Sequence, residues 1–288
     1  DRNGYVDDVR GWNYCANNGD VRDDDDHGSH VAGTIGAVGG NDEGIVGVAP
    51  NVKIMTLKIG FGSDCNADFI DIKRALKYAA DNGASIMNHS WGCSVPGSAD
   101  CSESRTLNEG IEYTQRRGLL FVQAAGNNGL NTDYTKADFW SSEHASVISV
   151  AATTRKDGIA EFSNYGRKTV DLGAPGVGIL STVRNNKYDY INGTSMASPH
   201  VAGAAALLKA YRPNWGYSQI KASLMSGTDP LPTLTNRTVS NGRLNIGASL
   251  SRLFPRWMSI VSGESGIILP NESIDVSFQL SGTGLPNG

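Results

Sequence analysis

The chain has 288 residues, of which 39% are hydrophobic, and a formal net charge of −4. This length is enough for one large α/β domain and the beginning of a second one. The small net charge gives no electrostatic reason to expect nucleic-acid binding, and no apolar run approaches the roughly 20 residues that a membrane-spanning helix needs.

Strand-like and helix-like segments alternate through most of the chain. Short apolar runs predict strands, and apolar residues at helical spacing predict helices. The predicted strands are 52–59, 84–88, 119–123 and 147–152, and the predicted helices are 68–81, 104–117, 201–210 and 218–226. This alternation favours an α/β fold of three layers, in which helices cover both faces of a mainly parallel central sheet. Polar groups that do chemistry are then expected where strands end and helices begin.

The first segment with candidate catalytic residues is Asp26-His27-Gly28. Small residues follow His27, so a helix can pack closely there while the imidazole stays at its leading end. Two other interpretations remain open, a buried structural histidine or a metal pair formed by His27 and His30. Zinc needs a third and a fourth ligand at a recognisable spacing, which the scattered cysteines do not provide. The acidic run 23–26 is expected to be a solvated loop.

A second segment, Ala124-Ala125-Gly126-Asn127, follows the apolar run Leu119-Leu120-Phe121-Val122. An asparagine at the C-terminal end of a strand commonly makes a turn. It can also direct its side-chain amide N–H at an oxyanion. The residues alone leave both roles open for Asn127.

The third segment, Asn192-Gly193-Thr194-Ser195, places a serine on a glycine turn that leads into the alanine-rich helix predicted at 201–210. The serine hydroxyl can cap the helix by accepting a backbone N–H. It can instead be a nucleophile, with the helix N-terminus beside it to stabilise developing negative charge.

The four cysteines are Cys15, Cys65, Cys93 and Cys101, and none forms a CxxC pair. An even number at loop-like positions predicts two disulfides and an oxidising compartment. Cys93 and Cys101 flank a short loop and pair most naturally, which leaves Cys15 with Cys65. Free buried thiols are the alternative.

The chain begins with alternating oxygen-bearing residues around a glycine, a pattern similar to the middle of a calcium-binding loop. The predicted ligands of a structural calcium ion are Asp1, Asn3, the carbonyl of Tyr5, and Asp7. A solvated acidic turn is the alternative. No organic cofactor is expected.

Four motifs together resemble those of the subtilisin-like serine proteases (subtilases, peptidase family S8). They are HGSHVAGT, SWG, AAGNNG and NGTSMASPHVAG, in the family's order and spacing. The resemblance implies a secreted serine endopeptidase that works through an acyl-enzyme. It implies Ser195 as the nucleophile, His27 as the general base and Asn127 as the side-chain oxyanion donor, with the backbone N–H of Ser195 as the second donor.

The resemblance also implies how a substrate binds. Ser90, Trp91 and Gly92 match the strand that pairs with the substrate main chain, and Ala125 and Gly126 are expected to belong to the same binding site. The expected partners are protein or peptide substrates, bound by a monomer, with no nucleic acid and no membrane.

One part of the family pattern is missing. The triad aspartate of the family precedes the histidine, in an Asp-Thr-Gly or Asp-Ser-Gly turn, and no such turn precedes His27. Asp26 is a poor substitute, because adjacent side chains rarely reach one another's far ring nitrogen. We therefore expect the aspartate to lie outside this chain, which is then a fragment. The alternative functions are a non-proteolytic subtilase-like scaffold and a calcium-dependent binding module.

Residues 1–250 are thus predicted to form the peptidase domain, incomplete at its N-terminus. Beyond it, 257–263 and 273–280 alternate polar and apolar residues, which is a β pattern. Residues 251–288 look like the opening strands of an immunoglobulin-like module, with too few strands for a sandwich.

Overall fold

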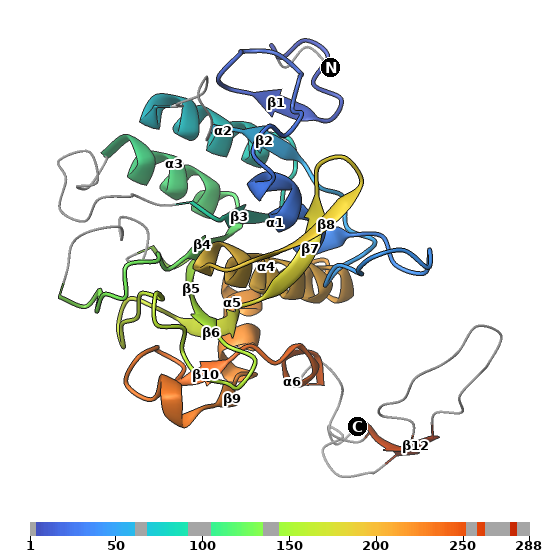
Figure 1. Cartoon of the computed structure of the whole chain (residues 1–288), viewed down its shortest axis with the longest axis vertical. Coiled ribbons are helices and arrows are strands. Elements are labelled where there is room, and N and C mark those ends of the chain that lie inside the picture. The colour runs from blue at the N-terminus through green and yellow to red at the C-terminus, as the bar shows by residue number, and fades with distance from the viewer. Residues whose placement is uncertain are drawn as a thin grey trace, which may run out of the picture.

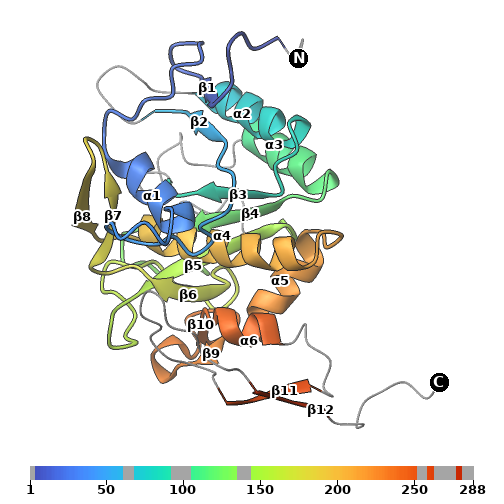
Figure 2. The ribbon, with the colours of Figure 1, turned by 90° about the vertical axis from the view of Figure 1, so that its right-hand side faces the viewer.

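The computed structural model has a parallel sheet at its centre (Figures 1 and 2). It describes residues 4–60, 68–91, 105–134 and 144–251, and the backbone of strands β11 (Met258–Ser262) and β12 (Ser277–Leu280). The strands of the central sheet are β3 (Ile86–His89), β4 (Leu120–Ala124), β5 (Val147–Thr153), β6 (Leu172–Pro175), β9 (Asp229–Pro230) and β10 (Gly242–Arg243). They lie in the order β3-β4-β5-β6-β10-β9, and only β9 runs antiparallel to its neighbour.

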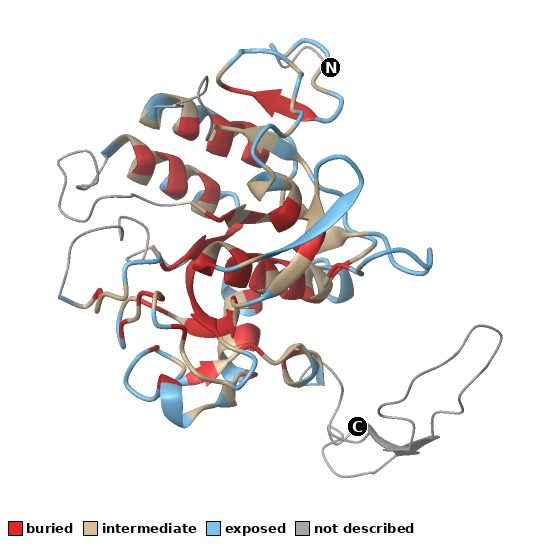
Figure 3. Ribbon diagram, in the orientation of Figure 1, coloured by how far each residue is buried: buried red, intermediate tan, exposed pale blue. Residues whose placement is uncertain are grey.

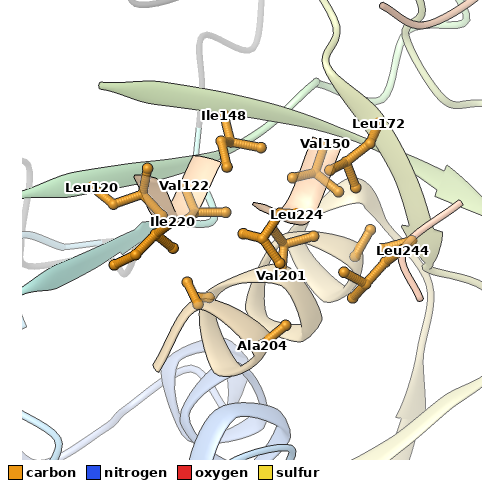
Figure 4. Close-up of a cluster of buried hydrophobic side chains, with 14 of the residues drawn as sticks. Leu120, Val122, Ile148, Val150, Leu172, Val201, Ala204, Ile220, Leu224 and Leu244 are labelled. Atoms are coloured by element: carbon orange, nitrogen blue, oxygen red, sulfur yellow. The ribbon is translucent and has the colours of Figure 1, made fainter. Parts of the chain in front are cut away.

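Helices cover both faces of this sheet. They are α1 (His27–Gly36), α2 (Phe69–Asp81), α3 (Arg105–Arg116), α4 (Thr194–Tyr211), α5 (Tyr217–Ser226) and α6 (Ile246–Ser251). The side chains of β4 contribute to both layers, because alternate side chains of a strand point to opposite faces of the sheet. Leu120 and Val122 join the cluster under α4 and α5 (Figure 4), whereas Phe121 joins the cluster under α2 and α3. Burial is concentrated between the layers (Figure 3), and the predicted three-layer α/β fold is confirmed.

Helix α4 begins earlier than predicted, at Thr194 instead of residue 201. Pro199 lies inside this helix and lacks the N–H that would bond to the carbonyl four residues before it. That carbonyl belongs to Ser195, and it accepts a hydrogen bond from the Ser90 hydroxyl at 2.8 Å instead. The serine of the glycine turn is therefore part of the first helical turn.

The strand predicted at 52–59 is shorter and does not join the central sheet. Only β2 (Thr56–Lys58) is a strand, and it pairs in parallel with β1 (Gly11–Asn13) in a separate two-stranded sheet. Val52 and Ile54, which precede β2, are 36% and 42% exposed. The second edge of β2 and the outer edge of β3 have no strand partner in the described part of the chain.

A hairpin that the sequence did not predict connects the sheet to α4. Its antiparallel strands are β7 (Ile179–Val183) and β8 (Lys187–Ile191), and it lies against α1 (Figures 1 and 2). Further along, a short 3₁₀ turn, η2 (Pro232–Leu234), precedes β10. Strands β11 and β12 pair antiparallel, as the β pattern predicted. The domain boundary near residue 250 stays a prediction. No helix within the described ranges is long and apolar enough to span a membrane.

The packing of α1 against the hairpin depends on one glycine. A Cβ at Gly33 would overlap the Thr182 hydroxyl and lie 2.6 Å from Ser181 Oγ. We expect Gly33→Ala to lower the free energy of unfolding by about 1–3 kcal/mol, measured by chemical denaturation. Gly28→Ala in the same helix is the control, because its Cβ would meet only the Asp23 carboxylate, at 3.6 Å. Equal destabilisation by both changes would rule out this packing as the cause.

Candidate active site

Reciprocal hydrogen bonds join the first turn of α4 to the end of β3. Ser195 Oγ donates to the Ser90 carbonyl at 2.8 Å, and Ser90 Oγ donates to the Ser195 carbonyl at 2.8 Å. The Asn88 amide extends this contact, since its Nδ2 donates to Ser90 Oγ at 2.8 Å and its Oδ1 accepts from Ser198 Oγ at 2.6 Å. The side chain and the carbonyl of Ser195 are therefore both held by the residue that follows β3.

Asn127 follows β4, and Thr194 fixes its orientation. The backbone N–H and the hydroxyl of Thr194 both donate to Asn127 Oδ1, at 2.9 and 2.8 Å. The amide oxygen therefore faces Thr194, which leaves Nδ2 to face elsewhere. A Cβ added at Gly193 would lie 3.7 Å from Asn127 Nδ2 and 3.5 Å from the Ser195 nitrogen. Two N–H donors thus border the space that Gly193 leaves open, and such a pair can stabilise an oxyanion.

A buried asparagine that the sequence analysis missed holds the loop around Asn127. Asn164 is fully buried. Its Oδ1 accepts from the N–H groups of Asn128 and Leu130 at 3.1 and 2.9 Å, and its Nδ2 donates to the Ala125 carbonyl at 2.9 Å. These partners are 34 to 39 residues away in the chain, so no local pattern around Asn164 indicates them.

The predicted substrate-binding residues are described in part. Ala125 is fully buried, and its N–H donates to the Val150 carbonyl. The Gly126 N–H donates to Thr194 Oγ1 at 3.1 Å. Trp91 is half-buried, and its ring centre is 5.6 Å from that of His89. Gly92 lies outside the described residues. The structure places Ser90, Gly126 and Asn127 around the start of α4, while their contacts with a substrate stay a prediction.

His27 is the first residue of α1, and this helix packs against α4. Its ring is half-buried and forms no hydrogen bond with any residue of the described ranges. Burial lowers the pKa of His27, and the negative charges of Asp25 and Asp23 act against that decrease. A neutral imidazole near neutral pH can accept a proton, as a general base must.

Asp23 caps the helix that begins with His27. Its Oδ1 accepts from the N–H groups of Asp25 and Asp26 at 2.9 and 3.2 Å, and its Oδ2 accepts from the Ser29 N–H at 2.7 Å. Burial alone would raise the pKa of Asp23, but these hydrogen bonds outweigh it and lower the pKa. The loop before His27 is therefore ordered by its own carboxylate.

Two other carboxylates of this run also have partners. Asp24 accepts from Lys58 Nζ at 2.9 Å, and Asp26 forms an ion pair with Arg184 at 2.7 Å. The prediction of a merely solvated acidic loop at 23–26 is wrong, because three of its four carboxylates are engaged. Asp26 faces the β7–β8 hairpin, which agrees with its being a poor substitute for the triad acid.

His30 has a structural role in the fold. It is fully buried, and its Nε2 lies 2.9 Å from the Ile179 carbonyl and 3.2 Å from the Asp189 carbonyl. Because carbonyls only accept, this nitrogen carries the hydrogen and donates to them. No group of three or more His, Cys, Asp or Glu side chains within the described ranges is placed to hold a metal ion. A metal pair of His27 and His30 therefore has no further ligands in that part of the chain.

The calcium and disulfide predictions fall largely on residues outside the described ranges. Asp1 and Asn3 lie there, Tyr5 packs its ring against Trp12 at 4.9 Å, and Asp7 is exposed. Calcium binding by Asp1, Asn3, Tyr5 and Asp7 stays a prediction. Cys15 is disulfide-bonded. Since Cys65, Cys93 and Cys101 are not described, the pairing also stays a prediction.

A helix-borne serine beside two N–H donors, with a histidine on the adjoining helix, is typical of a serine hydrolase. The chain belongs to the subtilase family, because the family model of that name (Peptidase_S8) matches residues 1–245.

The relatives are serine proteinases. A thermophilic serine proteinase of Bacillus sp. (strain AK1) is 42% identical over 69% of this chain and 46% of its own length. Subtilisin BL of Lederbergia lenta is 38% identical over 71% of this chain and 70% of its own. This chain therefore spans about half the length of the first relative.

The structural likeness covers most of the chain. A solved cold-adapted subtilisin-like serine proteinase superposes with a TM-score of 0.69 and 30% identity, over 81% of this chain and 79% of that one. A protease from Pseudoalteromonas arctica PAMC 21717 superposes with a TM-score of 0.68 and 33% identity, over 78% of this chain and 70% of that one.

The hydrogen bonds of Asn164 lead to a stability prediction. Asn164→Leu keeps a similar side-chain volume but leaves two N–H groups and one carbonyl of the Asn127 loop without partners. We expect the free energy of unfolding to fall by at least about 2 kcal/mol. Asn128→Ser is the matched control, because that side chain is exposed. A calorimetric midpoint that Asn164→Leu does not lower would contradict this role.

Proposed function

We propose that the intact protein containing this chain is a serine endopeptidase. The observation that carries the proposal is Ser195 in the first turn of α4, beside the Asn127 amide and its own backbone N–H. Ser195 Oγ attacks the scissile carbonyl while His27 takes its proton. The oxyanion forms against the two donors. His27 then protonates the leaving amine, and water hydrolyses the acyl-enzyme by the same steps.

The nucleophile has to change its hydrogen-bond partner during this reaction. Ser195 Oγ donates to the Ser90 carbonyl at 2.8 Å. For proton transfer the hydroxyl must turn to the His27 ring instead. The Ser90 carbonyl is then available to accept an N–H from a substrate strand, which supports the proposed substrate-binding role of Ser90, Trp91 and Gly92.

We further propose that the triad aspartate comes from residues outside this chain. Among the described carboxylates, Asp26 is paired with Arg184, Asp23 accepts backbone N–H groups, and none is hydrogen-bonded to His27. The edges of β2 and β3 that lack partners in the described ranges are places where a further strand can pair. Such an aspartate would hold the His27 tautomer and stabilise its protonated form.

The finer parts of the proposal concern substrate and location. Main-chain hydrogen bonds at Ser90 would favour broad selectivity among protein and peptide substrates, bound by a monomer. The disulfide of Cys15 supports secretion into an oxidising compartment. A structural calcium ion at Asp1, Asn3, Tyr5 and Asp7 belongs to the same proposal and rests on the sequence pattern alone.

Covalent labelling tests the proposed function directly. A fluorophosphonate should label the intact wild-type protein, and Ser195→Ala should abolish the labelling together with casein cleavage. In subtilisin, a relative, loss of the nucleophile or the histidine lowers kcat about 2 × 10⁶-fold, and we expect a similar loss for Ser195→Ala and His27→Ala. Ser218→Ala, at an exposed serine, is the control. An unlabelled wild-type protein would instead support a non-proteolytic scaffold or a calcium-dependent binding module.

The oxyanion role of Asn127 has its own kinetic signature. Asn127→Leu should lower kcat about 10²–10³-fold, the loss known for the equivalent donor in subtilisin, with KM nearly unchanged. The reason is that the donor acts on the charge of the transition state. Steady-state kinetics on a peptide anilide would measure both constants, with Asn128→Leu as the control. An increase in KM alone would mean that Asn127 only shapes the pocket.

A further inference from the structure

The β7–β8 hairpin contacts the helix of the base and leads directly to the nucleophile. It lies along α1 (Figures 1 and 2), and the chain continues from β8 through Asn192 and Gly193 into α4. Thr182 Oγ1 donates to the Ser29 carbonyl at 2.9 Å, and Ser181 Oγ donates to the His30 carbonyl at 2.7 Å. The hairpin is thus attached to the first turn of the helix that His27 begins.

The turn of this hairpin also binds the residue directly before His27. Arg184 donates to Asp26 through three groups. Its Nε and its backbone N–H reach Oδ1 at 2.7 and 2.9 Å, and a terminal guanidinium nitrogen reaches Oδ2 at 3.2 Å. Asp26 has a left-handed backbone, with φ of 73°, a conformation that Asp and Asn adopt more readily than most residues. Both the backbone and the side chain of Asp26, the residue before His27, are therefore fixed.

Titratable groups on three elements act on His27, on Asp26 before it, or on His30 in the same helix. On its own loop are Asp23 and Asp25, whose charges raise the pKa of His27, and on α1 is His30, which lowers it. The hairpin contributes Arg184 and Lys187, which both act on Asp26. From α4, His200 lies close enough to interact with His30. Arg184 is the group among these that forms an ion pair with the carboxylate adjacent to the base.

We propose that Arg184 is a positioning residue for the general base. Its ion pair with Asp26 fixes the leading end of α1, and with it His27, relative to the hairpin that leads into α4 and Ser195, and it masks the carboxylate of the residue next to His27 in the chain. This inference rests on the proposed peptidase function. The Arg184 and Asp26 side chains are 39% and 36% exposed, and an ion pair this exposed adds little to global stability. Its effect should therefore appear at His27 and leave the melting temperature nearly unchanged.

Four variants separate the positioning of His27 from the masking of the Asp26 charge. Arg184→Met leaves the Asp26 charge unmasked and should move the His27 titration to higher pH, with a roughly two-fold loss of kcat/KM below its midpoint. Asp26→Asn leaves the arginine charge uncompensated and should move the titration to lower pH. The double variant should titrate close to wild type. Arg184→Lys keeps the charge but loses the planar fork, so it should lower kcat about ten-fold without moving the titration.

The His27 titration would be followed by NMR in the intact protein carrying Ser195→Ala, which prevents self-cleavage, and kcat by kinetics in the active protein. Arg22→Met is the matched control, because Arg22 forms a similar bidentate pair with Asp20, and neither residue is among the groups that shift the pKa of His27. Shifts of the two single variants in opposite directions support the proposal. Equal titrations in all variants, or a shift as large in Arg22→Met, overturn it. Failure of fluorophosphonate labelling in the wild type would overturn the peptidase function instead, and the NMR titrations would still decide the role of Arg184.

Discussion

The site depends on a hydrogen bond that α4 cannot make within itself. Pro199 has no N–H to offer the Ser195 carbonyl, so that carbonyl is left to accept from elsewhere. The Ser90 hydroxyl donates to it, and the Asn88 amide orients that hydroxyl while accepting from Ser198. The carbonyl that Pro199 leaves without a helical hydrogen bond thus connects α4 to the end of β3. This bond acts together with those from Ser195 Oγ to the Ser90 carbonyl and from Thr194 to Asn127, and together they hold the first turn of α4.

The same turn orients Asn127, the side chain that we propose as an oxyanion donor. Thr194 uses both its N–H and its hydroxyl on Asn127 Oδ1, so the amide has one orientation available to it. From the other side Asn164 holds the loop that carries Asn127, and the loop cannot shift without breaking its backbone hydrogen bonds. Thr194 and Ser195, consecutive residues of one helical turn, therefore orient the Asn127 amide and the hydroxyl that we propose as the nucleophile. A Cβ at Gly193 would contact both donors, at 3.5 Å from the Ser195 nitrogen and 3.7 Å from Asn127 Nδ2, so the glycine leaves the space beside them open.

The sequence predicts those features that arise from local patterns. Apolar periodicity predicted α2, α3, α5 and the strands β3 to β5 within two residues of their observed bounds, and the motifs predicted His27, Asn127 and Ser195. The errors have distant causes. The predicted start of α4 followed the alanine-rich run and was too late, and the Ser90 hydroxyl that takes the role of the missing Pro199 N–H lies 105 residues away from Ser195. The ion pairs of the acidic run 23–26 have no local signature, because Lys58 is 34 residues from Asp24 and Arg184 is 158 residues from Asp26.

Exposure alone would suggest that the β7–β8 hairpin is free to vary, since residues 187–190 of β8 are exposed. Its attachments argue otherwise. The Asn192 side chain accepts the Gly178 N–H at 2.6 Å and closes the base of the hairpin, while Ser181, Thr182 and Arg184 bind the first turn of α1. A surface hairpin is therefore fixed at two places, to the beginning of the helix that starts with His27 and to the segment that leads into Ser195, although neither residue belongs to it.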